Sequence, residues 1–301
     1  MGGNGLRKAA KLAGIVLAVL ALAALGLVGG GAWLGERKMA RTVSVRVVPV
    51  SVTASSASLQ RGRYLFEARG CAECHAADGH GLAMIDDPNG LFVKSPNITG
   101  GRGGVTRAYE VSDWVRAIRH GVSPSGRPLL VMPSEDYSRM SDADLSALIA
   151  YARSLPPVEG TGTEIRMPLL VKALYGLGRV RDAAEKIDHR RPPEAAIAPA
   201  PDAAYGAYVA QMCRGCHRPD LSGGAIAGAP PSWPSASRLA PGPQSAMARY
   251  DTLAKFAAMM KSGKRPDGSA VSAVMPFATL AELDDTDVAA LYAYLTSLPA
   301  H

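Results

Sequence analysis

The stretch RGCAECHAADGHG, residues 69–81, contains two cysteines three positions apart, Cys71 and Cys74, followed at once by His75. A Cys-x-x-Cys pair occurs in structural zinc sites and in redox-active dithiols, and the same pair followed by histidine occurs where haem is attached to a chain. These three kinds of site need different surroundings. The rest of the sequence therefore decides between them.

The motif occurs twice, because Cys213, Cys216 and His217 repeat it 142 residues later, and the two copies contain all four cysteines of the chain. Two further motifs recur with an offset of 143: Val-Met-Pro at 131–133 and 274–276, and the runs SDADLSALIAYARSLP at 141–156 and DDTDVAALYAYLTSLP at 284–299. Separated motifs in nearly constant register indicate one fold used twice.

Each repeated unit is predicted to be helical. The run VSDWVRAIRHG, residues 111–121, has apolar residues at helical spacing and Gly121 as its expected stop. The last helix of each unit is expected to start after Ser141 or Asp284 as the N-cap and to end before a proline. Apolar residues at helical spacing also predict a helix leading into each CxxCH motif. The expected fold class is all-α.

The predicted helical units help to decide which kind of site the cysteines form. Four cysteines are too few for a disulfide framework, and a thioredoxin-like dithiol needs a βαβ setting. A zinc site built from the two distant pairs is the more serious alternative, but it leaves the histidines and the repeated methionines without a role. Covalent haem uses every residue, because cysteines at i and i+3 of one helical turn can each form a thioether with one porphyrin.

The haem hypothesis gives each residue of the motif a role. We expect two covalently attached haem c groups, with these attachment residues and first iron ligands: Cys71, Cys74 and His75 for one, and Cys213, Cys216 and His217 for the other.

The second ligand of each iron must come from a distant loop. Met132 and Met275 follow the first cysteine of their motif by 61 and 62 residues, each within Val-Met-Pro. Methionine sulfur is a soft donor that suits haem iron, and the following proline restricts the loop that carries it. Unrepeated methionines are interpreted as core residues. His80 and His120 are alternative ligands, although neither has a counterpart in the second unit.

The net charge of +7 is concentrated at the N-terminus. The first 60 residues carry seven basic side chains and one acidic side chain, whereas residues 61–301 carry 26 basic and 25 acidic side chains. Nucleic-acid binding needs locally clustered cations, so nucleic acid is not an expected partner of the main body.

A membrane anchor is predicted near the N-terminus. Leu12 to Leu34 form 23 uncharged residues, enough to cross a hydrocarbon core of about 30 Å as a helix. A cleaved signal peptide is the alternative. The length of the apolar run, and the lack of a clean small-x-small site between the run and Arg37, favour an uncleaved anchor. Basic residues flank both ends of the run, so the positive-inside rule leaves the orientation open.

Both units resemble class I cytochrome c domains. The residues RGRYLFEARGCAECH, NIT, WVRAIRHGVSPSGRPLLVMP and LIAYARSLPP are similar to those of membrane-anchored bacterial di-haem and tri-haem cytochromes c that accept electrons as dehydrogenase subunits. The resemblance implies a small helical fold around each haem, with His75/Met132 and His217/Met275 as axial pairs. The second unit has ASRLAPG where the first has SPNIT, and the chain has no third CxxCH motif.

The expected organisation combines the repeat with the anchor. It consists of a cytoplasmic tail at 1–11, a transmembrane anchor at 12–34, a tether at 35–60, a first cytochrome c domain at 61–157, a linker at 158–204 and a second cytochrome c domain at 205–301. The resemblance implies a single-pass protein of the bacterial inner membrane with its haem domains in the periplasm.

An iron held by the protein on both sides has no vacant position for oxygen or peroxide, which favours electron transfer and assigns no catalytic residue. We expect a relay of single electrons from a dehydrogenase or quinol-oxidising complex to another cytochrome or a terminal oxidase, with the membrane and these redox proteins as partners. Two alternatives stay open. One is a di-haem dehydrogenase or peroxidase in which one iron binds substrate, and the other is a non-catalytic assembly subunit.

Overall fold

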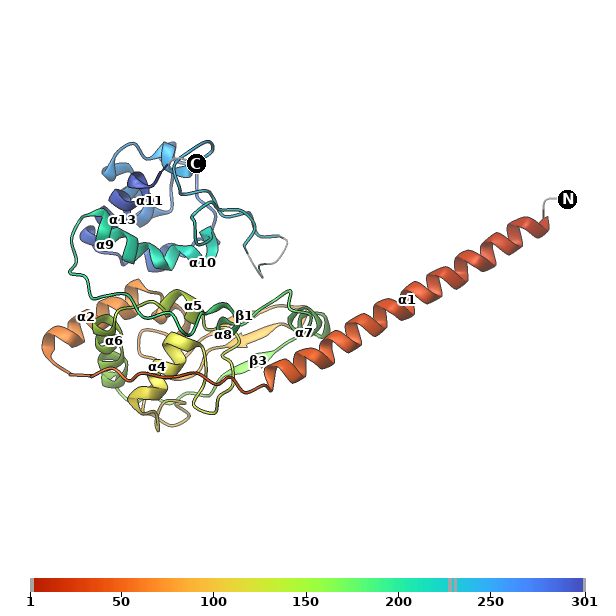
Figure 1. Ribbon diagram of the computed structural model, residues 1–301, viewed down its shortest axis with the longest axis horizontal. Helices are drawn as coiled ribbons and strands as arrows, with labels where there is room; N and C mark the ends of the chain where they lie inside the picture. The colour runs from red at the N-terminus through yellow and green to blue at the C-terminus, as the bar shows by residue number, and fades with distance from the viewer. Residues whose placement is uncertain (1–2, 227–228, 230–231, 300–301) are drawn as a thin grey trace.

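The computed structural model describes residues 3–226, 229 and 232–299. A long helix, α1 (Gly3–Met39), extends away from a body made of two lobes stacked on each other (Figure 1). By length and composition, Arg7–Met39 of this helix could cross a membrane, and the most apolar part of the segment is not buried against the body. The remaining helices belong to the two lobes or to the segment that joins them.

The first domain is built from five helices around one apolar core. They are α2 (Ser56–Ala68), α3 (Cys71–His75), α4 (Val111–His120), α5 (Ser134–Tyr137) and α6 (Asp142–Ser154). The helices α2 and α6 pack against each other, and α4 also contacts α6. The buried residues at the centre of the core include Leu65, Phe66, Trp114, Val115, Leu145 and Ile149.

The second domain repeats this arrangement. Its helices and 3₁₀ turns are α9 (Ala203–Val209), η1 (Ala210–Cys213), α10 (Arg214–His217), η2 (Ala246–Arg249), α11 (Leu253–Ser262), α12 (Phe277–Ala281) and α13 (Asp285–Ser297). The helices α9 and α13 pack as α2 and α6 do. The core of this domain includes Tyr205, Val209, Phe256, Met260, Leu291 and Leu295.

One glycine sets the closest helix contact in each domain. A Cβ atom added to Gly62 would collide with the carbonyl oxygen of Ala147, and one added to Gly206 would collide with that of Ala290. Only glycine permits this approach of two helix backbones. The two domains therefore share the same helix packing, and the predicted all-α class is confirmed.

The predicted helix ends are also present. The helix α4 ends at Gly121, whose φ of 64° lies in the left-handed region that favours glycine. The side chain of Ser141 caps α6 by accepting the N–H of Asp144 at 3.2 Å. Asp284 caps α13 in the same way, accepting the N–H of Asp287 at 2.7 Å. These caps fix where the last helix of each domain begins.

A small antiparallel sheet, not predicted from the sequence, lies beside the first domain. Its strands are β1 (Ala83–Asp86), β2 (Phe92–Lys94) and β3 (Glu164–Arg166), in the order β1-β2-β3. The strand β3 comes from the segment between the domains and pairs Ile165 with Val93. Strands of three or four residues are too short to show a period of two in the sequence.

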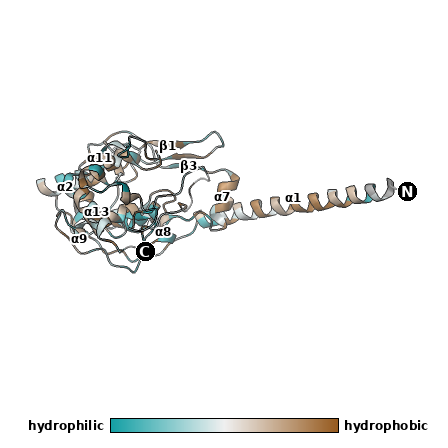
Figure 2. Ribbon diagram, turned by 90° about the horizontal axis from the view of Figure 1, so that it is seen from above, coloured by the Kyte–Doolittle hydropathy of each residue, from teal (hydrophilic) through white to brown (hydrophobic). Residues whose placement is uncertain are grey.

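The segment that follows α1 lies against the first domain. The backbone N–H of Val43 donates to Gly126 at 2.8 Å, the hydroxyl of Ser146 donates to the carbonyl of Ser51 at 2.6 Å, and Val50 is buried. Two helices between the domains, α7 (Leu169–Gly176) and α8 (Ala183–Lys186), follow β3. The helix α7 packs on the end of α1 nearest the body (Figures 1 and 2).

Candidate haem-binding sites

The first CxxCH motif forms the short helix α3. Gly70 begins it with a φ of 77°, and the hydroxyl of Tyr137 donates to the carbonyl of the preceding Arg69 at 2.9 Å. Cys71 and Cys74 lie on this one turn as free thiols. Burial raises the pKa of Cys71 to about 12, so its thiol is neutral at physiological pH.

His75 is oriented by a backbone carbonyl. Its Nδ1 lies 3.1 Å from the carbonyl oxygen of Pro96. Because a carbonyl only accepts, Nδ1 carries the proton and the Nε2 lone pair is free to bind a metal. Burial lowers the pKa of His75, which keeps the imidazole in the neutral form that binds iron.

Two adjoining cavities, of about 280 and 300 Å³, meet at this histidine. Cys71, His75 and Met132 line both of them, and Cys74 lines the larger. The other walls are mostly apolar, formed by residues that include Phe66, Ile98, Trp114, Ile118, Leu129, Leu148 and Val93. An imidazole nitrogen, a thioether sulfur and two thiols around an apolar space are the donor set and surroundings that a covalently bound haem requires.

The loop that carries Met132 is held by its neighbour. The backbone N–H of Ser134 donates to the carbonyl of Met132 at 2.8 Å, while the buried Ser134 hydroxyl donates to Ala117 of α4 at 2.8 Å. The methionine therefore comes from a loop fixed to the α4 helix, on a different segment from α3. This is the arrangement that ligation from two sides needs.

The second domain repeats these contacts. His217 Nδ1 lies 2.7 Å from the carbonyl oxygen of Ser237, and burial lowers the pKa of this histidine. The N–H of Phe277 donates to the carbonyl of Met275 at 2.8 Å, the same bond as in the first domain. Cys213 and Met275 both pack against the core of this domain, and burial raises the pKa of Cys213 to about 12.

The alternative ligands do not line the two cavities. The His80 ring is bound to Asp78 at 2.6 Å and is exposed, and the His120 ring is bound to His189 at 3.0 Å. In the part of the chain that the structure describes, no three His, Cys, Asp or Glu side chains are grouped to hold a metal ion. The zinc alternative, which joins the two cysteine pairs in one site, therefore has no support.

The carbonyls that orient the histidines were not identified from the sequence. Pro96 belongs to SPNIT and Ser237 to ASRLAPG, a place where the two units differ in sequence. Both segments nevertheless supply a carbonyl 20 or 21 residues after the histidine. Because every residue has a carbonyl, only the spacing after CxxCH could have pointed to it.

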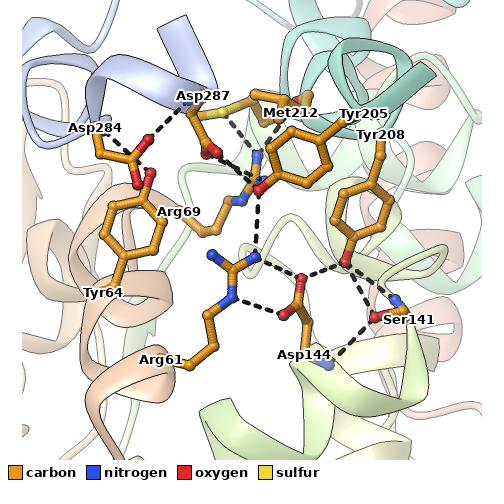
Figure 3. A network of polar contacts seen from close by, with 11 residues as sticks. Arg61, Tyr64, Arg69, Ser141, Asp144, Tyr205, Tyr208, Met212, Asp284 and Asp287 are labelled. Carbon is orange, nitrogen blue, oxygen red and sulfur yellow. Dashed lines mark hydrogen bonds and ion pairs between the residues drawn. The ribbon is translucent and has the colours of Figure 1, made fainter. Parts of the chain in front are cut away.

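The interface between the domains lies next to both CxxCH motifs. The hydroxyl of Tyr208 accepts the N–H of Ser141 at 3.2 Å and donates to Asp144 at 2.7 Å. Tyr64 crosses in the other direction, where its hydroxyl accepts the N–H of Asp284 at 3.2 Å (Figure 3). Each domain thus holds the N-terminus of the last helix of the other.

Arg69, two residues before Cys71, makes the most direct link between the motifs. Its guanidinium donates to the carbonyl of Val209 at 3.2 Å and contacts the sulfur of Met212 at 3.0 Å (Figure 3). Met212 precedes Cys213 in the chain. From inside the first motif, Glu73 accepts the N–H of Thr279 at 2.8 Å. The segments that carry the two CxxCH motifs are therefore in contact with each other at the interface between the domains.

Comparisons with known proteins agree with this arrangement. Residues 203–299 match the family model of cytochrome c, and residues 57–151 match that of subunit III of cbb3-type cytochrome c oxidase. These findings define a protein of two cytochrome c domains that binds haem c covalently, and two haems fit the two domains.

The similar proteins include cytochrome subunits of dehydrogenases. The chain is 29% identical to the fructose dehydrogenase cytochrome subunit of Gluconobacter japonicus over 85% of its own length and 56% of that protein. It is 30% identical to the cytochrome c subunit of the quinone alcohol dehydrogenase of Gluconacetobacter polyoxogenes, over 82% of its own length and 57% of that protein. A diheme cytochrome c-type protein of Cereibacter sphaeroides is 32% identical, over 48% of each chain. The chain thus spans about half the length of these curated relatives.

Proposed function

We propose that the chain is a membrane-anchored electron carrier with two haems. It relays single electrons from a dehydrogenase or quinol-oxidising complex to another cytochrome or a terminal oxidase. The observation that carries this proposal is the meeting of Cys71, His75 and Met132 at one pair of apolar cavities. An iron with histidine on one side and methionine on the other undergoes one-electron oxidation and reduction without binding substrate.

The proposed ligands follow from the repeat. Cys71 and Cys74 attach the first haem, and His75 and Met132 are its axial ligands. In the second domain the same roles fall to Cys213 and Cys216 for attachment and to His217 and Met275 for ligation. The protein's contribution is to orient each imidazole through a backbone carbonyl, to exclude water with apolar side chains, and to hold the two attachment segments together through Arg69.

The proposed location is the outer face of the bacterial inner membrane, with α1 spanning the bilayer and both domains in the periplasm. Supporting this are the length and composition of α1 and the similarity to cytochrome subunits of bacterial dehydrogenases. An anchor of this kind raises the concentration of the domains near partners in the same membrane.

Carbon monoxide binding to the reduced protein tests the ligation. We expect the native protein to bind none, because both positions of each iron are filled, and the Met132→Ala and Met275→Ala variants to bind one per chain. Met84→Ala is the matched control, since Met84 lines the same 300 Å³ cavity without being a proposed ligand. Carbon monoxide binding by the native protein would contradict the carrier function and support an enzyme with one open iron.

A further inference from the structure

The helix α7 exposes an unusual amount of apolar surface for a segment between two globular domains. Its large exposed side chains are Leu169, Leu170 and Leu174, at 60%, 59% and 37%, followed by Leu177 at 44% just after the helix. Leu170, Leu174 and Leu177 follow one another at intervals of four and three residues, so they form one stripe along the helix. Ala173 and Tyr175 of the same helix are buried.

The buried side of α7 contacts α1 at very short range. A Cβ added to Gly31 would press on Ala173, one added to Gly35 would collide with the carbonyl of Lys172, and one added to Gly176 would collide with the carbonyl of Gly31. Small residues on both helices therefore let the two backbones touch. This contact fixes α7 to the last two turns of α1.

Polar contacts also stabilise this packing of α7 on α1, which we call the α1–α7 joint, at its end nearest the body. Lys172 pairs with Glu36, and the ammonium of Lys38 donates to the carbonyl of Tyr175 at 3.0 Å and lies 4.3 Å from the centre of its ring. Arg41 donates to the Tyr175 hydroxyl at 2.9 Å and to Asp182 at 2.8 Å. These bonds lie at the charged end of α1 and just after it. The side chain of Leu177 lies at Gly31, where its Cδ1 would be 3.2 Å from an added Cβ.

The exposed leucines of α7 thus lie on a helix that packs on α1, which exposes apolar side chains of its own. On that helix Leu27, Trp33 and Leu34 are 61%, 57% and 43% exposed, and Figure 2 shows α7 in hydrophobic colours beside it. The guanidinium of Arg37 lies 4.9 Å from the centre of the Trp33 ring. An apolar surface ending in tryptophan and basic residues is typical of the membrane–water interface. The helix α7 itself contains no acidic residue.

We propose that α7 lies in the interfacial layer of the bilayer, with its leucine stripe in contact with lipid acyl chains. This helix is then a second membrane contact beside α1. The inference rests on the proposed membrane anchoring of the chain. Lipid is favoured over a protein partner because α7 packs at Gly31 and Gly35 of the helix that is long and apolar enough to span the membrane. The α1–α7 joint then sets the distance of the first domain from the membrane.

Cysteine labelling of the full-length haem protein tests this placement. In the holoprotein the native cysteines are held in thioether bonds, so an introduced cysteine is the one reactive thiol. The Leu170→Cys variant, in vesicles of phosphatidylethanolamine and phosphatidylglycerol, is treated with a charged, membrane-impermeant maleimide, and mass spectrometry follows the reaction. Leu253→Cys is the matched control, because Leu253 is an exposed leucine of α11, 40% exposed and remote from α7. Leu25→Cys reports on the spanning part of α1.

We expect Leu170→Cys to react at least about tenfold more slowly than Leu253→Cys, because a thiol in lipid does not form the reactive thiolate. A photoactivated lipid probe should also label it. If Leu170→Cys reacts as fast as Leu253→Cys while Leu25→Cys stays protected, α7 is not in the membrane, although α1 is. Protection of Leu170→Cys only after a partner protein is added overturns the lipid contact in the same way. Fast reaction of Leu25→Cys contradicts the anchor itself.

Discussion

Tyr64 and Tyr208 occupy equivalent positions in the two domains, each two residues after the glycine that sets the helix contact, and each crosses to the other domain. Their hydroxyls accept the N–H of Asp284 and of Ser141 at the same distance, 3.2 Å. Asp284 and Ser141 are themselves equivalent, since they cap α13 and α6. The two domains are therefore related by an approximate twofold axis, as in a symmetric dimer whose subunits have been joined.

The crossing hydroxyls should stabilise the pairing of the domains. Tyr208→Phe leaves the N–H of Ser141 and the carboxylate of Asp144 each without one partner, and we expect a loss of about 1–2 kcal/mol in the free energy of unfolding. Tyr64→Phe should have a smaller effect of the same sign. Denaturant unfolding measures both. We also expect both variants to slow electron exchange between the haems. Tyr292→Phe is the control, because the bond that it removes lies within the second domain, and we expect its rate of electron exchange to equal that of the native protein.

Arg69 should couple the two cofactor sites. It is buried, and its guanidinium also lies 3.9 Å from Asp287, which accepts the Tyr205 hydroxyl at 2.7 Å. Arg69→Met leaves that carboxylate in the interface without its cation, and we expect a loss of about 3 kcal/mol in the free energy of unfolding.

The kinetic consequence separates a link between the sites from simple destabilisation. After rapid one-electron reduction of the folded protein, electron equilibration between the haems should be slower in Arg69→Met than in the native protein. Arg69→Lys keeps the positive charge, so we expect it to lose less of the free energy of unfolding and less of the rate of electron equilibration than Arg69→Met. Unchanged equilibration in Arg69→Met would show that the contact between the motifs is structural only.

We predict that the free energy of unfolding depends on pH through His120, which lies against His189. Burial, together with the nearby His189 and Arg119, lowers the pKa of His120 to about 4 from its ordinary value of 6.5. Between these values the unfolded chain binds a proton that the folded protein does not, so stability falls as the pH decreases from 6.5 to about 4. Denaturant unfolding across this range should show a slope that is smaller in His120→Asn. His80→Asn is the control, because His80 is exposed, and an equal reduction there would argue against the assignment.

The α1–α7 joint should fail when a side chain is added to α1 at the contact. Gly35→Val places its side chain on the carbonyl of Lys172, whereas Gly26→Val, at a position with nothing within 4 Å of the added Cβ, places it in open space. We expect Gly35→Val to move α7 and to raise the maleimide reactivity of Leu170→Cys at least about tenfold, while Gly26→Val leaves it unchanged. Equal reactivity in the two double variants would mean that the close packing does not hold α7 in place.

Much of the site could be predicted from the sequence because its chemistry depends on side chains. Cysteine, histidine and methionine stand at matched positions in two units, and the structure brings Cys71, His75 and Met132 to one pair of cavities. Their roles as ligands stay a prediction. The orienting carbonyls of Pro96 and Ser237 could not be predicted, because a backbone group leaves no mark on residue type.

The interface between the two domains could not be predicted from the sequence for a different reason. The spacing from Gly206 to Cys213 is two residues shorter than that from Gly62 to Cys71. Aligning the motifs on their cysteines therefore places Tyr208 opposite Phe66 and conceals its equivalence to Tyr64. Only the packing of α2 on α6 and of α9 on α13 reveals the correct register.

The glycine contact at residues 31–35 joins α1 to α7, and the bond from Val43 to Gly126 joins the segment after α1 to the first domain, so we expect α1 and the first domain to turn together. With α1 in the bilayer as proposed, rotation of this helix about its own axis sweeps the two domains around in the plane of the membrane. Under this proposal, encounters with a partner in the same bilayer become a two-dimensional search, so their frequency depends on how densely both proteins populate the membrane surface.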